Sequence, residues 1–297
     1  MGCFKPLTAF QRIADRQIIF KEGRDTREIK LPCGQCIGCR LEKSRQWALR
    51  CVHEAQLHSQ NCFVTLTYSD ENLPQWGSLN REDLTKFFKR VRKNVGPFRY
   101  YACGEYGDET KRAHYHACLF GLDFNDKVPF SNKGGHTLYI SPTLNELWKL
   151  GNTSIGELTF ETAAYTARYV MKKGFGKGMP PYCRLDAETG EAIPLEQPYA
   201  VMSLRCRGAD GKVGGLGSEW IRKYATDIYN HEKDFIMVRG KKMKPARYYD
   251  KVYDEINPEH MEVIKANRQL NSTTPSNATL RAREKIAHAR KTYKTSI

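Results

Sequence analysis

Two histidines, His114 and His116, lie one residue apart in the run 114-HYHACLF-120, whose composition is typical of a strand. Successive side chains of a strand point to opposite faces, so both imidazoles would lie on one face, where they could bind a divalent metal. Glu105 ends a second strand-like run, 99-RYYACGE-105, and the polar segment between the runs predicts a β-hairpin. The expected register brings Glu105 near enough to supply an oxygen ligand.

Two imidazoles and one carboxylate leave coordination positions open for water or a phosphate oxygen. Mg²⁺ or Mn²⁺ would suit such a site better than Zn²⁺ if its task is to polarise a phosphodiester. The alternative interpretation is a structural or surface pair of histidines, with Glu105 as a strand-end residue that faces solvent.

Tyr165 and Tyr169 lie four residues apart in 165-YTARYVMKK-173, so on a helix they share one face, and Lys172 follows about one turn later. A tyrosine with a pKa near 10 is a poor nucleophile in neutral water. It needs a metal on the scissile phosphate and a cation beside the developing charge. The histidine pair and Lys172 could supply both. The alternative is that the two tyrosines are aromatic residues of the core or of an interface.

Ten cysteines occur in a chain whose opening, MGCFKPLTAF, lacks an apolar signal core, which favours reduced thiols over disulfides. Cys33, Cys36 and Cys39 form C-x-x-C-x-x-C, and with Cys3 they could form a tetrahedral site for structural zinc. An iron–sulfur ligand set is an alternative, but the usual bacterial pattern continues with Cys-Pro, whereas Arg40 follows here. Unligated thiols are the third interpretation.

Lys and Arg outnumber Asp and Glu by 48 to 33, which favours a polyanionic partner such as nucleic acid or an acidic membrane surface. No segment approaches the roughly 18 consecutive apolar residues of a membrane span, so no membrane-spanning segment is expected, and nucleic acid is the expected partner in place of a membrane. No P-loop of the form G-x-x-x-x-G-K-[ST] occurs, so no helicase domain is predicted.

Periodicity predicts the elements that must position these residues. Gly and Pro dominate 174–217, where loops are expected, and the polar, basic end from 258 is typical of a tail or a frayed helix. The regular elements predicted elsewhere are a basic amphipathic helix after the cysteine cluster, a strand at 62–68, a helix that begins at Asn80, the hairpin, a helix at 142–150, a strand at 153–159 and a helix at 160–173.

The order of these elements resembles that of a known superfamily. FVTLTYSDENLP, then HYHACLFG, then Y-x-x-x-Y-x-x-K on a helix resemble the three motifs of the HUH endonucleases. More closely, the chain resembles the replication initiators of gokushoviruses, small single-stranded DNA phages of the Microviridae, over about residues 3–250. This likeness includes Cys3, PCGQCIGC, an Arg-rich helix with Trp47, GGLGSEWI and PARYYD near residue 245.

The resemblance implies an α+β fold with a central antiparallel sheet of about five strands flanked by helices. The metal ligands would lie on a central strand and the tyrosine helix beside it. The expected division is a Cys-rich segment with the basic helix, an HUH core, a loop-rich extension and a basic polar tail, at residues 1–60, 61–175, 176–257 and 258–297.

The resemblance also implies roles for single residues. His114 and His116 would bind the catalytic ion with Glu105 as the third ligand, Tyr165 and Tyr169 would be the nucleophiles, and Lys172 would face the phosphate. Thr65 and Thr67 share one face of the first strand, where a role near DNA competes with that of structural hydroxyls.

The activity implied is rolling-circle initiation in the host bacterial cytoplasm. One tyrosine would nick single-stranded origin DNA, forming a 5′-phosphotyrosine link and a 3′-OH for a host polymerase, and the other would rejoin the displaced strand. A host helicase would unwind the duplex.

Two other functions compete with this one. A phosphohydrolase of the H-x-H-x-H type would need a third histidine where Cys118 stands, so that signature fails. A non-enzymatic, zinc-containing DNA-binding or packaging protein would explain the charge and the cysteines, and would leave the tyrosines and histidines as structural residues.

Overall fold

The fold is taken from a computed structural model of the 297-residue chain. The chain forms two compact units, unit 1 from Met1–Ser44 and Ala266–Ile297, and unit 2 from Arg45–Lys265. Across the described part of the chain, no helix combines the length and the apolar character needed to cross a membrane. The structure describes residues 2–107, 110–133, 135–171, 182–186, 188–208, 211–230, 233–271, 273 and 275–295.

Unit 2 is built on a seven-stranded antiparallel sheet with the strand order β12-β5-β6-β4-β9-β8-β7. The expectation of about five strands is therefore too low. The β7–β8 hairpin accounts for two strands, and Pro129 and the neighbouring polar residues hide its strand pattern. The bounds are β4 (Asn61–Thr67), β5 (Arg99–Tyr106), β6 (Ala113–Phe120), β7 (Val128–Lys133), β8 (His136–Ile140), β9 (Thr153–Gly156) and β12 (Tyr199–Met202).

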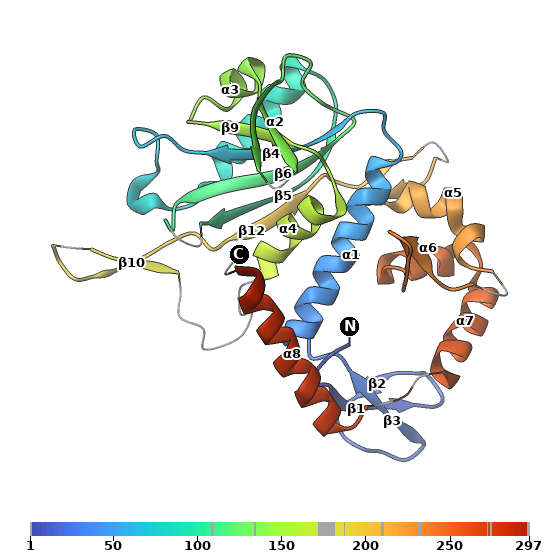
Figure 1. The fold of residues 1–297 in the computed structure, drawn as a ribbon. Coiled ribbons are helices and arrows are strands. Elements are labelled where there is room, and N and C mark those ends of the chain that lie inside the picture. Colours follow the sequence, from blue (N-terminus) through green and yellow to red (C-terminus); the bar gives the residue numbers. More distant parts are fainter. Residues whose placement is uncertain are drawn as a thin grey trace. The chain divides into compact units, whose positions relative to one another are not determined.

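Helices cover both faces of this sheet. Side chains alternate along each strand, and on β6 the side chains of both faces are apolar enough to pack against helices. On β6, Tyr115, Ala117 and Leu119 pack into the core formed with α2 (Arg81–Asn94) and α3 (Pro142–Trp148). Cys118 and Phe120 face the other way, toward α4 (Phe160–Met171) and the second half of α1 (Ile37–Ala55). In Figure 1, α2 and α3 lie on one side of the sheet and α4 on the other.

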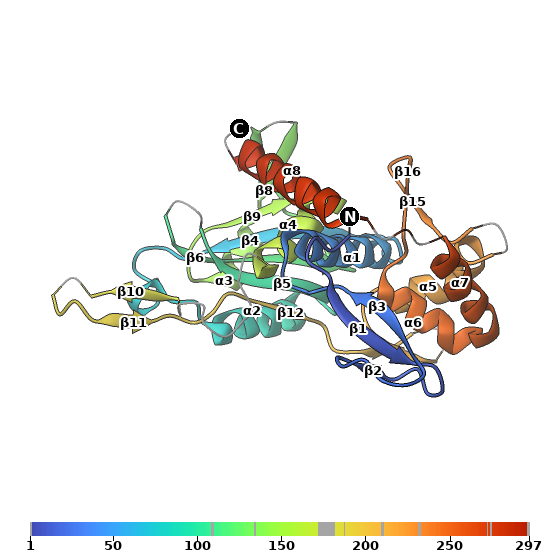
Figure 2. The ribbon, with the colours of Figure 1, turned by 90° about the horizontal axis from the view of Figure 1, so that it is seen from below.

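The predicted helix start at Asn80 is confirmed, since its side chain accepts a hydrogen bond from the Glu82 amide at 3.0 Å. The segment 174–217 was expected to form loops, but its described part contains five short strands. The β10–β11 hairpin projects from the edge of the sheet (Figure 2). The strands here are β10 (Cys183–Leu185), β11 (Ala192–Pro194), β12, β13 (Cys206–Arg207) and β14 (Val213–Gly214).

A second core in unit 2 joins α1 to the helices that follow the sheet. The motif GGLGSEWI contacts α1, because the Gly217 amide donates a hydrogen bond to the buried carboxylate of Glu54 at 2.6 Å. The motif PARYYD contacts α1 through Tyr248. The guanidinium carbon of Arg50 lies 4.0 Å from the centre of the Tyr248 ring and 4.1 Å from that of Trp47. The elements are α5 (Ser218–Ile228), β15 (Ile236–Val238), β16 (Lys241–Met243), α6 (Arg247–Ile256) and α7 (Pro258–Leu270).

Unit 1 contains more regular structure than its sequence pattern predicts. Residues 1–39 contain a three-stranded antiparallel sheet of order β2-β1-β3, and the basic C-terminal segment ends in a helix, α8. The bounds are β1 (Leu7–Arg12), β2 (Ile18–Ile19), β3 (Thr26–Leu31) and α8 (Asn277–Thr295).

Candidate functional site

The β5–β6 hairpin places its polar side chains on the face of the sheet covered by α4. Glu105 pairs directly with His114 in the antiparallel register, and Cys103 pairs with His116. On the other side of β6, Thr65 of β4 pairs with His116. The sequence-predicted ligands are therefore neighbours because of strand register alone.

The ligand atoms of Glu105, His114 and His116 all lie within 4.8 Å of one another. The Nε2 atom of His114 is 2.9 Å from Glu105 Oε1, and the Nε2 atom of His116 is 3.1 Å from the same oxygen. An octahedral ion with bonds of about 2.1 Å holds adjacent ligand atoms about 3.0 Å apart. The spacing of the three side chains therefore fits such an ion.

Hydrogen bonds at the other ring nitrogens fix the orientation of both imidazoles. His114 Nδ1 lies 3.0 Å from the Arg112 carbonyl oxygen, so Nδ1 carries the proton and donates it. His116 Nδ1 lies 3.0 Å from Thr65 Oγ1. Partners of this kind orient metal-binding histidines and leave Nε2 to bind the ion.

Burial favours the neutral form of the second histidine. His116 is only 5% exposed, and burial lowers its pKa below the ordinary 6.5, although the Glu105 carboxylate opposes the shift. Two imidazole nitrogens therefore converge with a carboxylate on one point. Glu105 Oε2 is also buried and accepts no hydrogen bond from the described residues. A cation between these groups would satisfy them, so the residues present fit a bound divalent ion.

Helix α4 brings Tyr165 to this cluster from a distant part of the sequence. The Tyr165 ring stands edge-on to the His116 ring, with 5.0 Å between their centroids. The backbone of Tyr169 continues α4 one turn further. The side chain of Tyr169 and the whole of Lys172 lie outside the described part of the structure.

Two groups beside the site were not assigned to it from the sequence. Thr65 contacts His116, whereas Thr67 donates to the Asn152 carbonyl at 3.0 Å and so has a structural partner. The register of β4 against β6 is the signal that distinguishes the two hydroxyls. The Arg112 carbonyl is a backbone group, so its residue type gives no signal.

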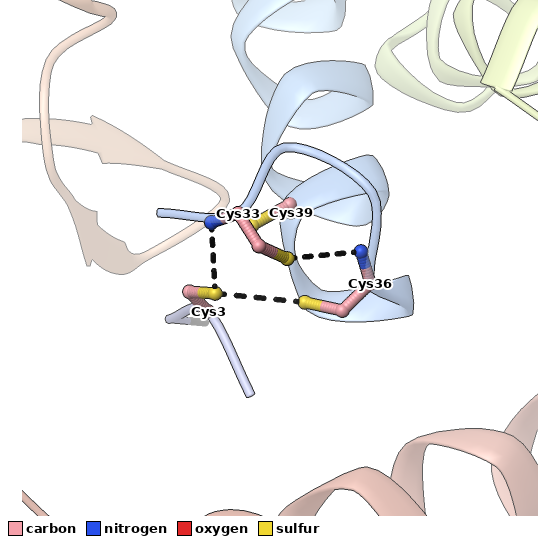
Figure 3. Close-up of side chains that lie close together, drawn as sticks. All are labelled: Cys3, Cys33, Cys36 and Cys39. Atoms are coloured by element: carbon pink, nitrogen blue, oxygen red, sulfur yellow. Dashed lines mark hydrogen bonds between the residues drawn. The ribbon is translucent and has the colours of Figure 1, made fainter. Parts of the chain in front are cut away.

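The four cysteines of unit 1 form a second cluster, drawn in Figure 3. All four sulfurs lie within 4.8 Å of one another, and Sγ of Cys3 is 3.8 Å from Sγ of Cys36. Four thiolates at about 2.3 Å from a tetrahedral zinc lie roughly 3.8 Å apart. The predicted ligand set is thus brought together with spacing that suits zinc.

Backbone amides around the cluster point at sulfur. The Phe4 amide donates to Cys36, that of Cys33 to Cys3 and that of Cys36 to Cys33, each at 3.3 Å. Burial raises the pKa of Cys36, but the amides of Phe4 and Cys39 and the neighbouring thiols outweigh it and lower the value to about 7. Burial and neighbouring thiols raise the pKa of Cys39, so a cation is needed to ionise the whole set.

Known proteins match this chain, and a family model covers the elements that form the Glu-His-His cluster. The model described as Replication-associated protein ORF2/G2P matches residues 61–174, from β4 to the end of α4. No solved structure matches the chain.

Three phage proteins are similar to the chain. It is 30% identical over 291 residues to replication-associated protein VP4 of Bdellovibrio phage phiMH2K, and the matched region covers 92% of this chain and 83% of the relative. It is 40% identical over 236 residues to replication-associated protein ORF2 of Spiroplasma virus 4, covering 74% and 67%. It is 32% identical over 153 residues to replication-associated protein ORF4 of Chlamydia phage 1, covering 48% and 38%.

Proposed function

Because this chain belongs to the family of Microviridae-type phage replication-associated proteins, we propose that it initiates replication by nicking and rejoining single-stranded origin DNA. We assign it to the two-tyrosine HUH endonucleases. The observation that carries this proposal is the edge-on contact of Tyr165 with His116, 5.0 Å between ring centroids, beside the Glu105–His114–His116 cluster.

The contact between Tyr165 and His116 supports a shared site because the two residues are distant in sequence. His116 and Tyr165 come from β6 and α4, which are separated in the chain by two strands of the sheet edge, helix α3 and strand β9. A core aromatic would be expected to pack among apolar side chains, whereas Tyr165 lies against a candidate metal ligand. A hydroxyl that must attack a metal-held phosphate has to lie at such a place.

The reaction exchanges one phosphodiester for another. Mg²⁺ or Mn²⁺ bound by Glu105, His114 and His116 would polarise the scissile phosphate. The Tyr165 hydroxyl loses its proton and its oxygen bonds to phosphorus, the bond from phosphorus to the 3′ oxygen breaks, and that oxygen takes up a proton. The products are a 5′-phosphotyrosine link and a 3′-OH that a host polymerase can extend.

Rejoining takes two exchanges. The second tyrosine would cleave the displaced strand at the regenerated origin and release a new 3′-OH, and this hydroxyl would attack the first phosphotyrosine, close the strand and free the first tyrosine. Tyr169, one helical turn along α4, is the second nucleophile, and Lys172 is the cation that stabilises the charge developing on the phosphate. A host helicase supplies strand unwinding. The cluster of Cys3, Cys33, Cys36 and Cys39 would hold a structural zinc, which would join the N-terminus to the start of α1.

A covalent assay tests the proposal. The protein is incubated with single-stranded origin oligonucleotide and Mn²⁺, and a protein–DNA adduct that resists denaturation is expected. The double variant Tyr165→Phe, Tyr169→Phe should form no adduct while still binding the oligonucleotide. A non-enzymatic DNA-binding protein would form no adduct from any origin-length fragment, and that result would refute the nuclease assignment.

A further inference from the structure

Positive charge is concentrated in unit 1. Residues 1–44 and 266–297 contain 16 Lys and Arg against six Asp and Glu, whereas residues 45–265 contain 32 against 27. Unit 1 therefore carries +10 of the net charge of +15, although it holds only 76 of the 297 residues. The Glu-His-His cluster and α4 belong to unit 2, so this charge is not explained by the nicking site.

Helix α8 shows how the charge is displayed. Leu280, Glu284 and Ala287 follow one face of the helix and are its least exposed described residues. Glu284, the only acidic residue of α8, faces inward and pairs with Lys5 at 3.3 Å. The exposed flanks of the helix carry basic residues with no acidic neighbour on the helix surface, namely Arg281, Arg283, Lys285 and Arg290.

The three-stranded sheet of the same unit carries charges of both signs, with six Lys and Arg against four Asp and Glu over residues 7–31, and Arg12 lies 3.7 Å from Asp15. Ile13 and Phe20 are each 67% exposed, and each is adjacent in sequence to an exposed cation, Arg12 or Lys21. These pairs suit a partner with phosphates and with sugar or base surfaces.

We propose that unit 1 is a DNA-binding module that contacts the phosphate backbone and supplies most of the affinity of the protein for DNA. The inference rests on the proposed function only in taking DNA as the polyanion. In this arrangement unit 2 performs the chemistry, and unit 1 holds the DNA from which the nicked strand comes.

Two matched triple variants of the full-length protein test the module. The first replaces Arg281, Arg283 and Lys285 of α8 with Gln. The control replaces three exposed lysines of α2, Lys86, Lys89 and Lys93, with Gln, which removes the same charge from the face of the sheet opposite the Glu-His-His cluster. Binding is measured by fluorescence anisotropy, as a function of salt, with a duplex and with a single strand of one sequence, each about 30 nucleotides long.

The α8 variant should bind at least one of the two probes about tenfold more weakly than the control variant near 0.15 M salt. Its plot of log affinity against log salt should flatten, by about 0.9 per lost contact on a duplex and about 0.7 on a single strand. The probe that shows the loss identifies the form of DNA that unit 1 holds. Equal losses in the two variants, or no loss in either, would overturn the inference.

Adduct formation separates this inference from the proposed function. A short single-stranded oligonucleotide at saturating concentration should give the same amount of adduct with the α2 control variant as with the unaltered protein. Absence of adduct from the unaltered protein would refute nicking and leave the binding result unaffected. Adduct formation together with equal binding losses would refute the module alone.

Discussion

At the scale of single residues, the Glu-His-His cluster depends on which nitrogen of each imidazole carries the proton. The Arg112 carbonyl can only accept a hydrogen bond, so it fixes the tautomer of His114. Thr65 has the corresponding place beside His116. Both contacts leave Nε2 facing Glu105, where the proposed ion binds.

Thr65→Val tests this orienting contact. The substitution preserves shape but removes the hydroxyl, so we expect the affinity for Mn²⁺ to fall by about tenfold or more, measured by titration calorimetry or electron paramagnetic resonance. Thr67→Val on the same strand is the matched control, because its hydroxyl donates to the Asn152 carbonyl. A similar loss in both variants would contradict a specific role for Thr65.

His53 makes the stability of unit 2 depend on pH. It is 4% exposed, lies 3.5 Å from the Trp220 ring in a parallel stack, and is 2.9 Å from the Tyr249 hydroxyl. Burial lowers its pKa from 6.5 to about 3. The folded protein thus keeps His53 neutral where the unfolded chain is protonated, so stability falls as pH drops below about 6.5, while above that value the ring is neutral in both states.

His53→Gln should make this dependence shallower. Between pH 6 and 4 the free energy of unfolding of the unaltered protein should fall more steeply than that of the variant, by up to about 1.4 kcal/mol per pH unit. Urea unfolding followed by tryptophan fluorescence measures both slopes. Other acid-sensitive groups act equally in the two proteins, so parallel slopes would show that His53 does not stay neutral.

At the scale of elements, the sequence predicted the hairpin and the proximity of Glu105 to His114 and His116, because the signals are local. Two alternating strands with a short polar connection set the register, and the register sets the Glu105–His114 pair. The neighbours that complete the sheet gave no such signal. Pro129 interrupts the pattern of β7, and β12 follows a segment rich in Gly and Pro.

Local sequence patterns also could not predict which strands pair when the two strands are distant in sequence. β12 pairs with β5 across almost one hundred residues, and nothing in Tyr199–Met202 itself identifies that partner. The contact between α4 and β6 is of the same kind. The resemblance to a known family, and not periodicity, predicted that the tyrosine helix would lie beside the strand that carries His114 and His116.

The start of α1 offers a test of the cysteine cluster. A Cβ at Gly38 would lie 2.3 Å from the Gly2 carbonyl oxygen and 3.0 Å from the Phe4 ring, so Gly38→Ala must displace the segment that carries Cys3. We expect this variant to bind Co²⁺ or Zn²⁺ far more weakly, measured by the thiolate-to-cobalt absorbance. Gly2→Ala is the control, because a Cβ there meets nothing within 4 Å. Unchanged metal affinity in Gly38→Ala would argue against a four-cysteine site.

At the scale of the whole molecule, the sequence showed the excess of positive charge but not its distribution. Unit 1 is formed by two segments that are distant in sequence, Met1–Ser44 and Ala266–Ile297. No local sequence pattern predicts that these segments form one unit. Only after this grouping does two-thirds of the net charge appear in one compact unit. The two proposals therefore place the nicking chemistry in unit 2 and most of the DNA affinity in unit 1.

The site of covalent attachment tests the nicking mechanism most directly. The protein is reacted with a single-stranded origin oligonucleotide and Mn²⁺, digested with nuclease and protease, and its peptides are sequenced by mass spectrometry. We predict a 5′-linked nucleotide on the phenolic oxygen of Tyr165 or Tyr169, and none when His114 and His116 are replaced by Gln. Cleaved DNA without a linked nucleotide, or a nucleotide attached to any other residue, would contradict the mechanism.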